Sequence, residues 1–221
     1  MALNKKQASM ATRIGIAIVA VILVISFVPG LVGLFGSGES TQTDPAGQLQ
    51  TIAQKYSQTV QYNEQLLASD PTSYTVLVQQ GNVYFDWAYE ALSVDTGSAM
   101  PMWGQAIQYY ERALSVQPGD PAMMTDLAIA YDFSGRTDDA IAVVRATNEA
   151  APQFAPAYYH LGRFLQIKGD TAGAIEALQT YLAMDPTGQT PGGDPADAQA
   201  RLSQLSSAGG ASQPTTPQTT P

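Results

Sequence analysis

Residues 124–131 (MTDLAIAY) and 158–165 (YYHLGRFL) decide the fold of this chain, because both carry one helical pattern. The two segments are 34 residues apart, and a fixed period of roughly 20–50 residues is the sequence signature of a solenoid. The same offset relates further residues of like type: Gly135 to Gly169, Ala140 to Ala174, Val144 to Leu178, and Pro152 to Pro186.

The residue types at these positions suit a pair of closely packed helices. Small residues such as Gly162 and Ala174 let two helices approach, while the apolar residues between them fill the seam. Gly169 suits a turn with positive φ at the end of the first helix. Pro186 ends the second helix, because proline cannot continue it.

The pattern resembles the tetratricopeptide repeat (TPR), which has Leu-Gly at positions 7 and 8, Tyr at 11, Gly at 15, Ala at 20 and Pro at 32. The resemblance implies an all-α helical solenoid of three helix-turn-helix repeats with flanking helices, at residues 74–120, 121–154 and 155–188. The first repeat is out of phase by 13 residues, so we expect an insertion there. We expect its first helix to be prolonged through Trp87–Leu92 and a loop to follow at Ser93–Pro101.

An uncharged apolar run precedes the repeats, from Ile14 to Gly36. Its 23 residues would span about 34 Å as a helix, enough for a hydrocarbon core of ~30 Å. We therefore expect a single transmembrane helix at 14–36. A cleavable signal peptide is the alternative, because Ile14–Val28 has the length of its apolar region, although no Ala-x-Ala site follows.

Charge is divided unevenly around this run. Residues 1–13 carry Lys5, Lys6 and Arg13, and no acidic residue occurs before Glu39. The rest of the chain has 7 basic residues against 19 acidic ones. The positive-inside rule then predicts a single-pass protein of the cell membrane with residues 1–13 in the cytoplasm and the repeats on the extracytoplasmic side. A body this acidic repels phosphate backbones, so we expect no nucleic-acid partner.

Composition also limits the chemistry that the chain can perform. There is no Cys and a single His, His160, which we interpret as a packed or partly exposed residue, with a ligand role as the alternative. Asp95-Thr-Gly-Ser98 spells the aspartic-protease signature, but that chemistry needs two facing carboxylates and only one copy is present. We expect no enzyme activity, no catalytic residue, no metal site and no cofactor.

Three further segments surround the repeats. Residues 37–44 form a polar linker, and the TPR domain is expected to run from 45 to 205 with a final helix at 194–205. Asp194-Pro195 begins that helix as an N-cap followed by proline. Residues 206–221, rich in Ser, Thr, Gly and Pro, are expected to be disordered.

The resemblance implies a partner-binding groove, because TPR solenoids bind extended peptides or helices along the concave face of their first helices. Filling of this groove by the inserted segment or the C-terminal helix is the alternative. The carboxylate clamp of chaperone-binding TPR domains is absent here: Val78, Asp126 and Pro156 occupy clamp positions and only Asn82 agrees. The groove residues that the resemblance implies are Asn82, Phe85, Thr125, Ile129, Phe133, Tyr159 and Arg163.

These expectations combine into two hypotheses about function. The first is a membrane-anchored TPR scaffold or assembly factor, which holds a protein partner in its groove on the extracytoplasmic side. The second is a permanent accessory subunit of a larger membrane protein complex. Residues 14–36 would attach the protein to the membrane in both.

Overall fold

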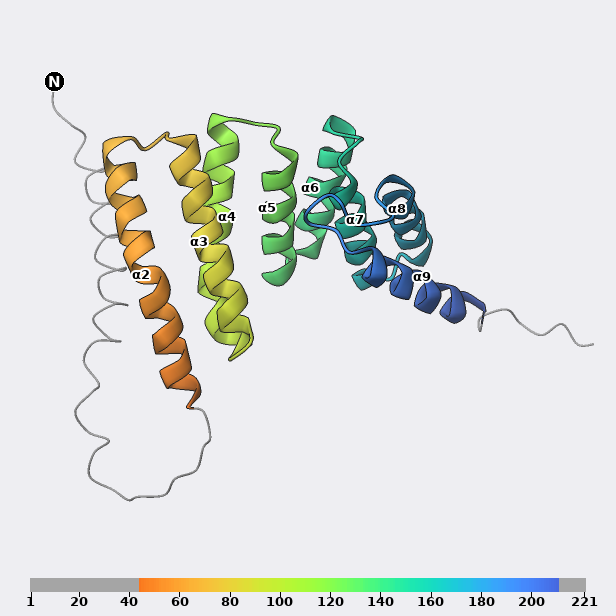
Figure 1. The fold of residues 1–221 in the computed structure, drawn as a ribbon, viewed down its shortest axis with the longest axis horizontal. Coiled ribbons are helices and arrows are strands. Elements are labelled where there is room, and N and C mark those ends of the chain that lie inside the picture. The colour runs from red at the N-terminus through yellow and green to blue at the C-terminus, as the bar shows by residue number, and fades with distance from the viewer. Residues whose placement is uncertain (1–43, 211–221) are drawn as a thin grey trace, which may run out of the picture. The chain divides into compact units, whose positions relative to one another are not determined.

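A computed structural model describes residues 44–210, and this part of the chain is all-α (Figure 1). The chain divides into two compact units between Thr51 and Ile52, and the packing below is that of residues 52–210. The helices are α2 (Pro45–Ser69), α3 (Tyr74–Leu92), α4 (Thr96–Val116), α5 (Pro121–Phe133), α6 (Thr137–Ala150), α7 (Ala155–Ile167), α8 (Thr171–Met184) and α9 (Pro195–Gly210).

The predicted membrane helix at 14–36 lies outside the described residues, as do the cytoplasmic segment 1–13 and nearly all of the linker. Within residues 44–210, no helix is long and apolar enough to cross a membrane. In the first unit, Asp44 caps the start of α2, because its carboxylate accepts hydrogen bonds from the amides of Ala46 and Gly47 at 3.1 and 3.2 Å.

The helices pack as consecutive pairs, which confirms the predicted helix-turn-helix repeats. Helix α3 packs on α4, α5 on α6 and α7 on α8, and each pair contacts the next through α4 with α5 and α6 with α7. Helix α9 packs on α8 after the last pair. Figure 1 shows the succession from α3 to α8.

Tight turns join the helices of the second and third pairs. Gly135 and Gly169 have φ of 82° and 80°, as predicted for the turn that ends the first helix of a repeat. Asp120 and Asp170 cap α5 and α8, and their carboxylates accept hydrogen bonds from backbone amides of the first turn. The local sequence therefore fixes both where each helix ends and where the next begins.

Close approach within each pair depends on the small residues of the repeat. A Cβ added to Gly162 would lie 2.6 Å from Cγ of Leu178, and one added to Gly81 would lie 2.5 Å from the Tyr110 ring. Ala174, in the second helix of its repeat, is fully buried. The predicted role of these positions in the seam is therefore confirmed.

The inserted segment differs from the prediction. Helix α3 ends at Leu92 as expected, but the loop expected at Ser93–Pro101 is wrong, because α4 already begins at Thr96. Asp95 starts that helix by accepting a hydrogen bond from the Ser98 amide at 2.6 Å. Pro101 lies inside α4 and removes one backbone donor, but burial of Ala99 and Trp103 on either side holds the helix.

The C-terminal helix is longer than expected. Asp194 caps it as predicted, accepting from the amides of Ala196 and Asp197 at 2.9 and 3.0 Å. Helix α9 then continues past Leu205 to Gly210, so the first five residues of the expected disordered tail are helical. Leu205 is buried against the core of the last repeat, which stabilises the final turns. Residues 211–221 lie outside the described part of the chain.

Candidate functional site

One face of the second unit gathers most of the side chains that could hold a partner. It consists of residues on α3 and α5, and we call it the α3–α5 face. On α3, one residue precedes an adjacent pair by three and four positions and another follows that pair by four and three, which places all four on one side of the helix. On α5 the spacings are three and four. The α3–α5 face comprises Asn82, Phe85, Asp86 and Tyr89 of α3 with Asp126, Ile129 and Phe133 of α5.

The aromatic end of this face is built around Trp103 of α4. The Phe133 ring stacks on the Trp103 indole at a centroid distance of 4.8 Å, and Phe85 meets it edge-on at 5.0 Å. Tyr89 lies edge-on to Phe133 at 6.2 Å and remains 60% exposed. Trp103 is fully buried, so the inserted segment supplies the floor on which the predicted groove residues Phe85 and Phe133 rest.

The other end of the face is acidic. Asn82 is exposed, and its side-chain oxygen accepts a hydrogen bond from the Tyr110 hydroxyl at 2.8 Å. Burial raises the pKa of Asp126 to about 6, and the nearby charges of Asp120 and Asp86 raise it further. Burial also raises the pKa of Asp86. No ion pair within residues 44–210 involves Asp86 or Asp126.

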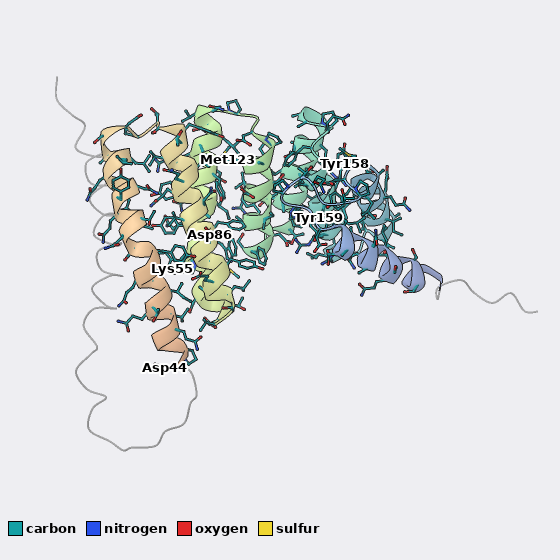
Figure 2. All side chains as sticks on the ribbon, viewed as in Figure 1. Asp44, Lys55, Asp86, Met123, Tyr158 and Tyr159 are labelled. Carbon is teal, nitrogen blue, oxygen red and sulfur yellow. The ribbon has the colours of Figure 1, made fainter. Side chains whose placement is uncertain are left out.

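The charge of Lys55 reaches this acidic end, but Lys55 is already engaged. Its ammonium group pairs with Glu90 of α3. Its charge lowers the pKa of Asp86 without cancelling the effect of burial. Figure 2 shows Lys55 on α2 and Asp86 on α3.

Two predicted groove residues on α5 differ in what they offer to a partner. Thr125 is only 3% exposed, and its hydroxyl donates to the Pro121 carbonyl at 2.8 Å. Its side chain therefore stabilises the first turn of α5. Ile129 is half-buried between Asp126 and Phe133 and contributes apolar surface to the α3–α5 face.

The predicted residues of the third repeat are covered by α9. Tyr159 is 7% exposed, and its hydroxyl donates to the Asp197 carboxylate at 2.8 Å. The Arg163 guanidinium lies over the Tyr159 ring at 5.7 Å. Arg201 of α9 donates to Asp197 at 2.5 Å and to the side chain of Gln166 on α7 at 2.7 Å. At this repeat, the C-terminal helix α9 therefore fills the predicted groove, which was the alternative to partner binding there.

His160 is packed, as interpreted from the sequence. It is 5% exposed, and its Nε2 lies 2.9 Å from the Gly192 carbonyl oxygen. Burial lowers its pKa to about 3, and the Arg163 charge acts in the same direction. The imidazole is therefore neutral and donates from Nε2. Asp95 likewise acts as a helix cap.

Sequence reasoning missed Tyr89 and Trp103, which both lie in or beside the insertion of the first repeat. The repeat pattern ends before Tyr89, but Tyr89 follows Phe85 at helical spacing and could have been found by extending that face of α3. Trp103 follows the expected loop at Ser93–Pro101, and the repeat pattern assigns no role to its position, so its contacts with Phe85 and Phe133 had no sequence signal. Asp126 was noted as a departure from the carboxylate clamp, and the structure puts it on the α3–α5 face.

Known proteins match the repeated part of this chain. Residues 102–163 and 155–187 match two family models described as tetratricopeptide repeat. The small glutamine-rich tetratricopeptide repeat-containing protein 2 of Mycosarcoma maydis is 30% identical over 102 residues. This alignment covers 45% of the present chain and 29% of that relative, so the chain spans less than a third of its length.

Solved structures share the fold. A thermophilic TPR protein of Thermus thermophilus has a TM-score of 0.54 at 15% identity, covering 75% of this chain and 82% of that one. The first TPR domain of Spaghetti (RPAP3), solved with an HSP90 peptide, has a TM-score of 0.51 at 19% identity, covering 64% and 96%. The helical domain is an all-α solenoid. Residues 102–187 match tetratricopeptide-repeat models, which supports the repeat pattern predicted from the sequence.

Proposed function

We propose that this chain is a membrane-anchored TPR scaffold or assembly factor that holds a protein partner on the extracytoplasmic side of the cell membrane. The α3–α5 face is the observation that carries the proposal. It presents the exposed ring of Tyr89, the half-buried rings of Phe85 and Phe133, and the carboxylates of Asp86 and Asp126. Aromatic anchors next to polar groups are typical of partner-binding surfaces.

A structural neighbour supports a protein partner. The first TPR domain of RPAP3 is described as bound to the HSP90 peptide SRMEEVD. In this chain, Val78, Asp126 and Pro156 stand where a carboxylate clamp would need other residues. The proposed partner is therefore a different protein from the chaperone tails that such clamps hold.

Membrane attachment rests on the sequence alone. The uncharged run at 14–36 follows three basic residues and precedes an acidic body, which favours a signal anchor with its N-terminus in the cytoplasm. We further propose that the protein performs no catalysis, since Asp95 caps a helix and His160 is packed with a neutral ring.

A permanent accessory subunit is the second candidate, and one observation favours it. Tyr62 and Leu66 lie one helical turn apart on α2 and expose apolar surface outside the α3–α5 face, at 61% and 36%. A lasting interface on α2 would cover both side chains.

Affinity purification of the full-length protein from solubilised membranes distinguishes the two candidates. We expect a scaffold to recover a partner in less than equal amounts and to lose it with Phe133→Ala. A permanent subunit would instead co-purify with other proteins in equal amounts. Their recovery would be unchanged with Phe133→Ala and lost with a Tyr62→Ser, Leu66→Ser double variant. Recovery unaffected by either variant would contradict both.

A further inference from the structure

The α3–α5 face has two ends of different chemistry, and their arrangement specifies a kind of partner. Asp86 and Tyr89 are three residues apart on α3, and Asp126 and Phe133 are seven apart on α5. At ~1.5 Å per residue, the carboxylates lie about 5–10 Å along the helices from the aromatic rings. On α5 Asp126 precedes Phe133, and on α3 Asp86 precedes Tyr89, although the ring of Phe85 stands directly before Asp86. The rings of Tyr89 and Phe133 lie 6.2 Å apart, and the charge of Asp86 acts on Asp126, so α3 and α5 both contribute to the acidic and the aromatic parts of the face.

Among residues 44–210, no cation forms an ion pair with Asp86 or Asp126 at the acidic end. Asp120 is committed to the fold, since it caps α5 and accepts a hydrogen bond from the Tyr74 hydroxyl at 3.0 Å. Asp126 accepts no hydrogen bond in the described residues, and Lys55 pairs with Glu90. The electrostatic potential at this end is therefore negative. The net charge of the surrounding domain is negative as well.

We propose that the α3–α5 face binds a protein segment that places a Lys or Arg side chain at Asp86 and Asp126 and an aromatic or aliphatic side chain at Tyr89 and Phe133. This inference rests on the proposed function and specifies the partner of the same face. A cation here would satisfy two carboxylates that repel each other in the free protein. An acidic segment would add a third negative charge and is excluded by that repulsion.

The aromatic end suits the same partner. The exposed ring of Tyr89 and the half-buried Phe133 provide apolar contact area for an anchor, with Trp103 as a rigid support. A guanidinium passing between the two ends would also meet the face of a ring, which attracts cations. Electrostatic attraction and apolar burial therefore favour one segment that is both basic and hydrophobic.

The experiment is a selection from a random 12-residue peptide library displayed on phage, against the full-length protein in detergent micelles. Enriched peptides are then synthesised and their Kd measured by fluorescence anisotropy. The variants are Asp126→Asn, Phe133→Ala and, as matched control, Glu149→Gln. Glu149 is exposed on α6 and makes no ion pair in the described residues, so Glu149→Gln removes one negative charge outside the α3–α5 face. Thermal melts verify that each variant folds.

We expect enriched peptides to combine Lys or Arg with an aromatic or aliphatic residue. Asp126→Asn should weaken the binding of these peptides by at least about tenfold, because it removes a charged hydrogen bond to the peptide. Glu149→Gln removes no such bond and should weaken binding by less than about twofold. Affinity should also fall as the pH drops through about 6, where Asp126 gains a proton, and this dependence should vanish in Asp126→Asn. The charged and titratable groups around Asp126 are Asp86, Asp120 and Tyr110, with Lys55 and Glu90 beside Asp86.

Two other results overturn the inference and differ in what they say of the proposed function. Acidic or uncharged peptides that lose affinity with Phe133→Ala would show that the face binds a partner of different charge, and the proposed function would stand. Failure to enrich any peptide sensitive to Phe133→Ala or Asp126→Asn would contradict both the inference and binding at this face.

Discussion

Asp126 lies half-buried on α5 among other carboxylates, and this position couples the stability of the fold to its pH. Its pKa is about 6 in the folded protein against 3.8 ordinarily, with burial as the main cause. A carboxyl whose folded pKa is raised stabilises the fold while protonated. That contribution is present below pH ~4 and is lost as the pH rises through about 6.

We therefore expect Asp126→Asn to raise the free energy of unfolding at pH 7.5 by about 1–3 kcal/mol and to change it little near pH 4. Urea unfolding at the two pH values measures the difference, with Glu149→Gln as the control for net charge. An equal loss of stability at both values would mean that the Asp126 carboxylate makes favourable contacts in the fold.

Tyr159 belongs to the core of the last repeat more than to a groove. It packs at 5.2 Å from the Tyr181 ring and donates its hydroxyl to Asp197 of α9. We expect Tyr159→Ala to lower the free energy of unfolding by about 3 kcal/mol, as for other buried aromatic residues, and Tyr159→Phe by about 1 kcal/mol. Denaturant unfolding of both variants tests this. Unchanged stability in Tyr159→Ala would return the side chain to the partner-binding surface.

At the scale of helices, the hairpin of α3 and α4 is the element that sets this solenoid apart from a regular array. Its second helix depends on Asp95, whose carboxylate accepts from both the amide and the hydroxyl of Ser98. We expect Asp95→Ala to destabilise the protein by about 1 kcal/mol, as the loss of an N-cap commonly does, whereas Asp95→Asn should retain most of the stability. Equal losses in the two variants would show that capping is not the role of Asp95.

The same hairpin explains how far the sequence could predict the fold. Helices α5 to α8 followed from the sequence, because Gly135, Gly169 and the small seam residues recur at a fixed spacing. The start of α4 did not, because Pro101 ends helices in most contexts, and here tertiary burial of Ala99 and Trp103 and the Asp95 cap outweigh it.

The candidate site was predictable in part. Phe85, Phe133 and Asn82 lie on one face as expected, because helix periodicity determines it. Coverage of Tyr159 by α9 could not be foreseen, since it depends on how a non-repeating helix docks on α7 and α8. The support of Phe133 by Trp103 likewise comes from the insertion, which has no counterpart in the other repeats.

For the whole molecule, the uneven charge predicts its orientation in the membrane. Because Lys5, Lys6 and Arg13 precede the apolar run and acidic residues follow it, we expect residues 39–221 outside the cytoplasm. Protease added to intact spheroplasts should then remove the repeat domain, and a cytoplasmic protein should survive as the control. Full protection of the domain would reverse the proposed topology.

The α3–α5 face as a partner-binding surface is the central claim, and photocrosslinking in living cells tests it most directly. Tyr89 is replaced by p-benzoylphenylalanine in the full-length protein, because its ring is the most exposed aromatic of the face. Glu149 on α6 receives the same replacement as a control.

We predict that position 89 yields a discrete crosslink to one partner, that mass spectrometry places the adduct in a segment containing Lys or Arg, and that Asp126→Asn reduces its yield. Position 149 should yield no such product. The absence of a discrete crosslink at position 89, or the same product from position 149, would contradict the claim that this face holds the partner.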